Sequence, residues 1–333
     1  MKATIDLSHK TVLISRTDSI GDVVLTLPLV GWIKERFPTS RVLFLGKSYT
    51  KDVLECSPNI DQIITLDEWE KVSFEEQIKL VKALNIFAFI HVFPNKHLAK
   101  LAKAAEIPHR VGTSHRLYHL FTCNVRPSFT RKKSNFHEAQ LNFELMRKFG
   151  VQTLPNRNEL MKYIGSFKPQ VEVPVQLKEV LKEGKRVILH TKSQGSAVEW
   201  PIDKYIALAN ILVVKGHTVY FSGTEKEGEL FRDALPTHPN IIDISGKSSL
   251  AEFIAFIESC DVLVACSTGP LHLASILGKK AIGLYTDLRP MHPGRWAPIG
   301  SMSKVLTATQ AAEPSLSDIE RISIESVFQV IDK

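Results

Sequence analysis

Short runs of β-forming residues alternate with helical stretches along most of the chain, and this alternation restricts the fold more than any other feature. The run Thr11–Ser15 (TVLIS) is typical of a strand that is buried on both faces of a parallel sheet. Residues 22–37 follow with apolar side chains on one helical face and stop before Pro38. Strand–helix alternation at this spacing predicts βαβ units and a parallel sheet.

The same alternation occurs twice, with an interruption at residues 150–184 that contains Pro155, Pro169 and Pro174. We predict further strands before the interruption at 42–45, 63–66 and 87–93, with helices at 75–84 and 97–105. After it we predict strands at 186–190, 218–222, 241–244, 262–265 and 281–285, and helices at 202–214, 226–234, 250–259, 271–277 and 322–331. A chain of 333 residues is longer than one core usually organises. We therefore expect two Rossmann-like doubly wound α/β domains, 1–165 and 166–333, facing each other across a cleft at the carboxyl ends of the strands.

Several classes of protein are not expected. No stretch approaches the ~18 consecutive apolar residues of a membrane-spanning helix, and the charged first ten residues lead directly into a strand, unlike a signal peptide. The four cysteines are far apart and form no CxxC pair, so neither structural zinc nor disulfides are expected. These features favour a cytoplasmic protein whose thiols are buried.

Basic residues gather between positions 109 and 133. In the whole chain, Lys plus Arg exceed Asp plus Glu by 42 − 35 = 7, but this segment has no acidic residue and contains Arg110, Arg116, Arg126, Arg131, Lys132 and Lys133. Such a patch suits an anionic partner, either a phosphorylated saccharide, lipid head groups or nucleic acid, and the alternative is a solvated loop. Nucleic acid is not expected as a partner, because no recognised binding motif accompanies the charge.

The turn after the first strand, residues 16–22 (RTDSIGD), opens a helix at the carboxyl end of that strand. Gly21 permits a close backbone approach or an unusual φ. Asp22 falls in the first helical turn, where the helix N-terminus stabilises an anion and fixes its position. Asp22 is therefore either a candidate catalytic carboxylate or an ordinary acid at a helix start. The turn lacks the GxGxxG pattern of a dinucleotide site.

A second constellation lies in the C-terminal half, where residues 266–272 (CSTGPLH) join a strand to a helix. Ser267 or Thr268 is a suitable N-cap, and Pro270 suits the first helical turn. Backbone N–H groups at such a terminus bind anions, so a diphosphate fits against Thr268 and Gly269, with His272 donating to it. The alternative is a well-capped helix with a packed histidine. Lys192 and the pair Ser222–Gly223 end two other strands at the same edge, which strengthens the expectation of a ligand site there.

Four segments of the sequence resemble family 9 glycosyltransferases, the lipopolysaccharide heptosyltransferases that use ADP-heptose. They are residues 16–28 (RTDSIGDVVLTLP), 199–201 (EWP), 246–250 (GKSSL) and 267–274 (STGPLHLA). The resemblance extends over nearly the whole chain, and the first and last segments are specific as a pair in this order and spacing.

The resemblance implies a GT-B fold, an inverting mechanism without metal, and Asp22 as the catalytic base. It also implies that the C-terminal domain binds the donor, an ADP-sugar, and that no further cofactor is needed. The expected donor contacts are Thr191, Lys192, Trp200, Ser222, Gly223, Ser267, Thr268, Gly269 and His272. The N-terminal domain is then expected to bind an anionic saccharide or lipid-linked acceptor through Arg16, Gly21, Lys47, Arg110 and Arg116.

Two positions depart from the family pattern. Ser267 stands where the family usually has Asp, and Val198 stands where it usually has a Lys two residues before the Trp-Pro pair. The first change removes a carboxylate from the nucleotide end, and the second removes a phosphate-binding cation. A different nucleotide or sugar, or a phosphate contact through Lys192, fits these changes.

The predicted function is transfer of a sugar, a heptose by resemblance, from a nucleotide diphosphate to a lipopolysaccharide-type or other anionic acceptor. Transient contact with the inner face of the cytoplasmic membrane would accompany a lipid-linked acceptor. Two alternatives remain: a non-catalytic nucleotide-sugar or saccharide-binding protein, and another GT-B enzyme such as a nucleotide-sugar epimerase.

Overall fold

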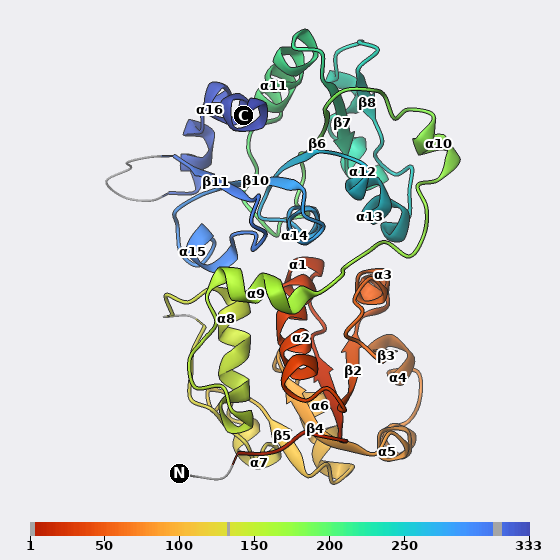
Figure 1. Cartoon of the computed structure of the whole chain (residues 1–333), viewed down its shortest axis with the longest axis vertical. Helices are drawn as coiled ribbons and strands as arrows, with labels where there is room; N and C mark the ends of the chain where they lie inside the picture. Colours follow the sequence, from red (N-terminus) through yellow and green to blue (C-terminus); the bar gives the residue numbers. More distant parts are fainter. Residues whose placement is uncertain (1–3, 132–133, 309–314) are drawn as a thin grey trace. The chain divides into compact units, whose positions relative to one another are not determined.

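The computed structural model describes residues 4–131, 134–308 and 315–333. The chain divides into two compact units, Met1–Phe167 and Lys168–Lys333, each built around one parallel sheet (Figure 1). This division falls two residues beyond the predicted boundary. The predicted α/β class is confirmed, because each unit is a Rossmann-like structure with one parallel sheet.

The first unit contains a five-stranded sheet of order β3-β2-β1-β4-β5, with every neighbouring pair parallel. The order reverses between β1 and β4, which creates a topological switch point at their carboxyl ends. Its strands are β1 (Thr11–Ser15), β2 (Arg41–Gly46), β3 (Gln62–Thr65), β4 (Ile86–His91) and β5 (His109–Val111). Its helices are α1 (Ile20–Val24), α2 (Leu27–Arg36), α3 (Lys51–Glu55), α4 (Leu66–Trp69), α5 (Phe74–Ala83), α6 (Lys96–Ala104), α7 (His119–Thr122), α8 (Glu138–Phe143) and α9 (Arg157–Ile164).

The second unit contains a six-stranded parallel sheet of order β11-β10-β9-β6-β7-β8. Here the switch point lies between β6 and β9. The strands are β6 (Arg186–His190), β7 (Thr218–Ser222), β8 (Ile241–Asp243), β9 (Val262–Cys266), β10 (Lys280–Tyr285) and β11 (Lys304–Thr307). The helices are α10 (Val175–Lys178), α11 (Ile202–Val214), α12 (Glu225–Gly228), α13 (Leu250–Glu258), α14 (Gly269–Ile276), α15 (Pro293–Trp296) and α16 (Ile324–Asp332).

Several elements differ from the sequence-based prediction. The helix expected over 22–37 is two helices, because Pro28 in the first turn of α2 has no N–H for a bond back to the preceding turn. The helix expected over 226–234 ends early, because Phe231 leaves helical conformation and buries its ring in the core. The interruption at residues 150–184 contains α9, which packs against α2.

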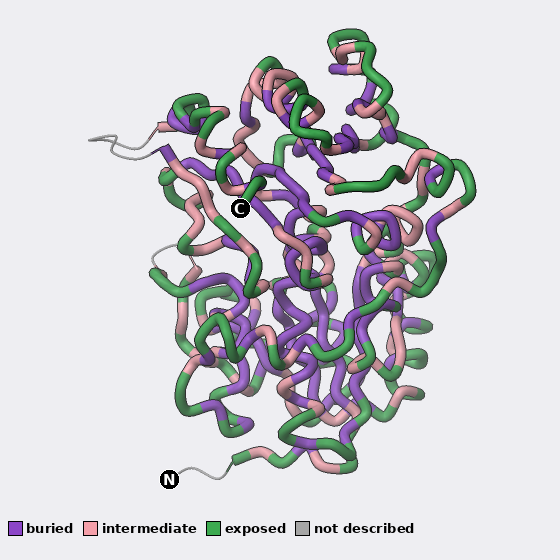
Figure 2. The backbone as a smooth tube through the Cα atoms, turned by 45° about the horizontal axis from the view of Figure 1, so that its top comes forward, coloured by how far each residue is buried: buried purple, intermediate pink, exposed green. Residues whose placement is uncertain are grey.

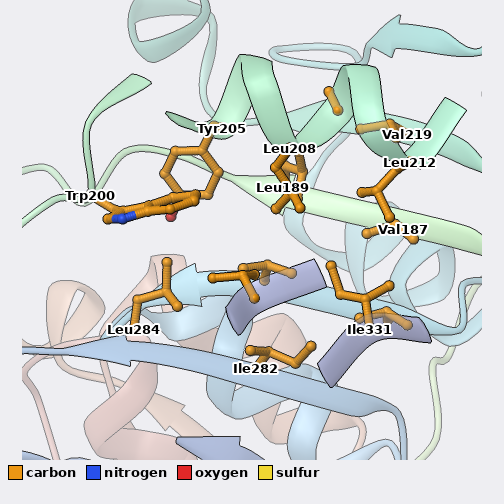
Figure 3. Packing of buried hydrophobic residues seen from close by; sticks show 14 of the residues in the cluster. Val187, Leu189, Trp200, Tyr205, Leu208, Leu212, Val219, Ile282, Leu284 and Ile331 are labelled. Carbon is orange, nitrogen blue, oxygen red and sulfur yellow. The ribbon is translucent and has the colours of Figure 1, made fainter. Parts of the chain in front are cut away.

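The central strands of both sheets are almost entirely buried, and Figure 2 shows buried stretches of backbone running through the interior of each unit. In the second unit, Figure 3 shows Trp200 and Tyr205 packed together, with Leu208 and Leu212 of α11 over β6. All four cysteines are buried. Among the helices that the structure describes, none is long and apolar enough to cross a membrane.

Candidate active site

Asp22 lies in the first turn of α1, at the switch point of the first sheet. Its Oδ1 accepts a hydrogen bond from Nη2 of Arg16, and its Oδ2 accepts one from the Ser19 hydroxyl at 2.6 Å. The side chain keeps 14% of its surface exposed. The carboxylate is therefore held in one orientation while part of it remains accessible, which is the arrangement that a general base requires.

Arg16 is buried and binds three carboxylates. Besides Asp22, its Nε lies 2.6 Å from Oδ1 of Asp18, and its Nη1 lies 3.1 Å from Oε1 of Glu138. Burial raises the pKa of the Asp18 carboxyl, and the charge of Asp22 raises it further, while Arg16 opposes both effects. Glu138 is fully buried and also accepts from Nε of Arg131 at 2.8 Å. A buried charge network fixes the orientation of Asp22.

The end of α1 is tied to the same network. The Thr26 hydroxyl donates to the Asp22 carbonyl at 2.8 Å. Nδ2 of Asn142, on α8, donates to the Leu25 carbonyl at 3.0 Å, and its Oδ1 accepts from Arg131 at 3.0 Å. These bonds satisfy backbone groups at the break between α1 and α2. Hydrogen bonds at the break therefore hold the backbone next to Asp22, in addition to the bonds that hold its carboxylate.

The residues predicted to bind the acceptor differ from one another in burial and in their partners. Gly21 has helical backbone and is buried in α1. The Lys47 ammonium lies 3.3 Å from Asp67 and 3.2 Å from Glu70. Arg110 donates to the carbonyls of Thr122 and Ile107, whereas Arg116 is exposed. Of the basic segment, Lys132 and Lys133 lie outside the described residues.

In the second unit, three buried polar atoms lie just after the carboxyl ends of β6 and β9, the two strands at its switch point. They are Oγ1 of Thr191, Oγ1 of Thr268 and Nδ1 of His272, and none has a hydrogen-bond partner within residues 4–131, 134–308 and 315–333. A buried polar atom without a partner is costly, so such atoms are expected to bond to a ligand or to water. Burial lowers the pKa of His272 to about 4, so its imidazole is neutral at pH 7.

The start of α14 adds backbone donors to this cluster. Thr268 occupies the N-cap position, but the cap has no side-chain hydrogen bond to the described backbone. Pro270 has no N–H, so the groups of Gly269 and Leu271 are the N–H donors without an intrahelical partner. Ser267 is half-buried just before them. Such a terminus binds anions, and a phosphate group matches the hydroxyl, imidazole and N–H donors present.

Lys192 follows Thr191, and its ammonium lies 3.1 Å from Oε2 of Glu199. The other oxygen of Glu199 accepts from the Ser193 N–H at 2.8 Å and the Ser193 hydroxyl at 2.9 Å. Glu199 therefore orders the loop after β6 and holds the Lys192 side chain in it.

Ser222 and Gly223 follow β7, and Trp200 precedes α11. The Ser222 hydroxyl lies 3.0 Å from Nδ1 of His190, and a Cβ on Gly223 would lie 3.1 Å from Cβ of Glu227. Trp200 is 1% exposed, and its indole N–H donates to the Ile322 carbonyl at 3.1 Å. The structure thus places the Trp200 side chain in the core, where it supports the loop by packing.

These features define a class of protein: two Rossmann-like units of the GT-B type, one with hydrogen-bond donors at a helix N-terminus that lack partners among the described residues and one with a fixed carboxylate. The model of glycosyltransferase family 9 (heptosyltransferase) matches residues 94–323. The chain therefore belongs to family 9, as the sequence resemblance implied, and is a glycosyltransferase.

Individual relatives agree with this assignment. A proposed glycosyltransferase of Haemophilus influenzae is 28% identical over 330 residues, which cover 96% of this chain and 95% of the relative. The lipooligosaccharide heptosyltransferase 2 of that organism is 25% identical over 302 residues, covering 84% of each chain.

Two solved structures share the fold. The family 9 glycosyltransferase of Veillonella parvula superimposes with a TM-score of 0.81 at 21% identity, covering 99% of this chain and 98% of that one. The ADP-heptose lipopolysaccharide heptosyltransferase II of Escherichia coli gives 0.75 at 17% identity, covering 97% of both.

Sequence reasoning missed Glu138 and Asn142 as parts of the site. Both lie more than 100 residues from their partners near Asp22, and the local pattern around them is that of an ordinary helix start. The sequence offers one signal for Glu138: it is the first acidic residue after the long basic segment.

Proposed function

We propose that this glycosyltransferase moves a heptose from an ADP-sugar to an anionic, lipopolysaccharide-type saccharide, with inversion and without a metal. The observation that carries this proposal is the set of buried polar atoms without partners among the described residues, at the ends of β6 and β9. These donors suit a nucleotide diphosphate. The names of the relatives, which include lipooligosaccharide heptosyltransferases, support heptose and this acceptor class.

In the proposed reaction, the acceptor hydroxyl attacks the anomeric carbon and Asp22 takes the hydroxyl proton. A new C–O bond forms as the bond from the anomeric carbon to the diphosphate breaks. The leaving diphosphate gains negative charge, which the N–H groups of Gly269 and Leu271, the Thr268 hydroxyl and the His272 imidazole stabilise. A single displacement of this kind inverts the anomeric centre.

The phosphates also need a side-chain cation, because Val198 stands where the family usually has Lys. We assign this role to Lys192, which sits at the end of β6 beside Thr191 and is paired with Glu199. A diphosphate competes with one carboxylate for this ammonium. Arg16 supports the base by orienting Asp22, and Arg116, which is exposed, is the candidate contact for an anionic acceptor.

A thermal-shift screen tests the donor proposal directly. ADP and ADP-sugars should raise the melting temperature by mass action, and more than UDP, GDP or adenosine do at equal concentration. A preference for UDP-sugars, together with a product that keeps the nucleotide, would favour the epimerase alternative. Binding without turnover of donor in the presence of acceptor saccharides would favour the non-catalytic alternative.

A further inference from the structure

Three large apolar side chains are exposed on one side of the turn and short helix that follow β5. Leu117, Leu120 and Phe121 keep 75%, 45% and 70% of their surface exposed. Their spacing of three and four residues places them on one helical face. The helical turns are continuous here, since the His119 N–H donates to the Arg116 carbonyl at 2.9 Å and the Leu120 N–H to the Leu117 carbonyl at 3.1 Å. We call these three side chains the α7 ridge.

The opposite face of α7 is fixed to the first unit. His119 is fully buried; its Nδ1 lies 2.9 Å from the Thr113 carbonyl oxygen, and its ring centroid lies 5.9 Å from that of His91, the last residue of β4. Arg110 donates to the Thr122 carbonyl at 2.7 Å, and Arg126 donates to the Leu120 and Cys123 carbonyls at 2.8 and 2.9 Å. The ridge is therefore exposed on an anchored helix beside the edge strand β5 (Figure 1).

The surroundings of the ridge are basic. The sequence from residue 107 to 137 contains no Asp or Glu, and Arg116 and Arg126, which lie within nine residues of Leu117 in the sequence, are exposed. The neighbouring helix α6, which packs against α7, adds Lys96, Lys100 and Lys103, all exposed. Apolar side chains beside positive charges match an anionic bilayer, where the first enter the interface and the second meet the head groups.

The size of the ridge also favours a bilayer over a protein partner. A stable protein interface uses about 20–30 residues on each side, and three side chains supply only a small part of that. Interfacial membrane binding, in contrast, needs only a narrow apolar face and nearby cations.

We propose that the α7 ridge docks this protein on an anionic lipid bilayer, with Leu117, Leu120 and Phe121 inserted at the head-group level. This assigns the membrane contact to one surface, and it rests on the proposed function only in that a lipid-linked acceptor would be found there. Docking by this surface brings the first unit to the membrane.

Flotation with lipid vesicles tests the proposal on the full chain. The parent protein should float with vesicles of phosphatidylglycerol and phosphatidylcholine, stay behind with phosphatidylcholine alone, and dissociate as salt rises. The variant Leu117→Ser/Phe121→Ser should lower the partition coefficient about tenfold or more, because two large apolar side chains no longer enter the interface. The matched control is Val214→Ser/Leu230→Ser, which changes side chains that are 85% and 69% exposed in the second unit and should bind like the parent.

Three outcomes would overturn the docking proposal: equal flotation of ridge variant and parent, equal binding to neutral and anionic vesicles, or a ridge variant that changes only the oligomeric state. The last result would make the ridge an interface between copies of this chain. Transfer to a soluble acceptor without lipid chains, measured without vesicles, should be the same in ridge variant and parent. If the parent fails to transfer but still floats, the proposed function fails and the docking proposal stands.

Discussion

Arg16 binds the side chains of Asp18, Asp22 and Glu138, and each restricts where its guanidinium lies. A buried arginine of this kind needs compensating anions, because desolvation of its charge is costly. Glu138 supplies one from α8 and is shared with Arg131. The orientation of Asp22 therefore depends on a residue 116 positions away in the sequence.

Replacing Glu138 by Gln should destabilise the protein by about 3 kcal/mol, since it leaves two arginines short of one buried anion. Urea-unfolding curves measure this loss. Glu106→Gln is the matched control, because Glu106 pairs with Lys82 at 2.8 Å but is highly exposed, and it should shift the curve little. Equal shifts of the unfolding curve for the two variants would mean that Glu138 stabilises the protein no more than an exposed ion pair does.

His91 should make the protein less stable in mild acid. Burial lowers its pKa from 6.5 to about 3, and the neighbouring His119 and Arg110 contribute. The unfolded state then binds more protons than the folded state between these values, so stability is complete above pH 6.5 and falls as the pH drops towards 3.

At pH 5, which is 1.5 units below the unfolded-state pKa of 6.5, the free energy of unfolding should be lower by about 2 kcal/mol because of His91. Urea unfolding at pH 7 and pH 5 should show a smaller pH difference for His91→Leu than for the parent, whereas the variant of an exposed histidine, His115→Leu, should behave like the parent. The same pH difference in all three proteins would contradict the role of His91.

At the scale of elements, the parallel strands and the helices between them could be predicted, because buried parallel strands are continuous apolar runs and their helices have one apolar face. The edge strands β5 and β11 were missed. They are short, and the residues of β11 are mostly half-buried, so neither has the apolar run of a central strand. The division between α1 and α2 depends on Pro28 and on Asn142 of a distant helix, and local periodicity cannot show the second contact.

The positions of the candidate site residues in the fold could be predicted in part for the same reason. Thr191 follows β6, and Thr268 and His272 follow β9; these two strands are neighbours and parallel, so both end at the same edge of the sheet. The pairing of Lys192 with Glu199, the core position of Trp200 and the Arg16–Glu138 contact depend on side-chain packing between separate segments.

The N-terminus of α14 offers a variant that separates ligand binding from folding. Because the Thr268 hydroxyl has no partner in the described part of the chain, Thr268→Val should leave the melting temperature unchanged or raise it slightly. The same variant should weaken ADP binding by about 1 kcal/mol while leaving adenosine binding unchanged. Calorimetry with both ligands measures this. Equal losses for ADP and adenosine would place the hydroxyl away from the phosphates.

At the scale of the whole molecule, both units use the same device: a sheet whose strand order reverses, with the reactive or binding groups at the point of reversal. The first unit presents a carboxylate there, and the second presents hydrogen-bond donors. This division of roles between proton acceptor and charge stabiliser is what the proposed transfer requires.

The proposed stabilisation of the leaving group by N–H groups, His272 and Lys192 predicts a transfer rate that EDTA does not change. The initial rate of transfer, measured with and without chelator and again after adding Mg²⁺ or Mn²⁺, tests this prediction. A strict requirement for either ion would mean that the diphosphate charge is neutralised in another way.

Transfer from ADP-heptose by the Asp22→Asn variant tests the central claim most directly. The substitution keeps the size of the side chain and removes the base, so turnover should fall ~10²- to 10⁴-fold while the affinity for donor stays nearly unchanged. Asp52→Asn is the matched control, because Asp52 is another acid in the first turn of a helix of the same unit, and it should turn over like the parent. An Asp22→Asn enzyme that transfers at the parent rate would show that Asp22 is only an acid at the start of a helix, and the proposed mechanism would be wrong.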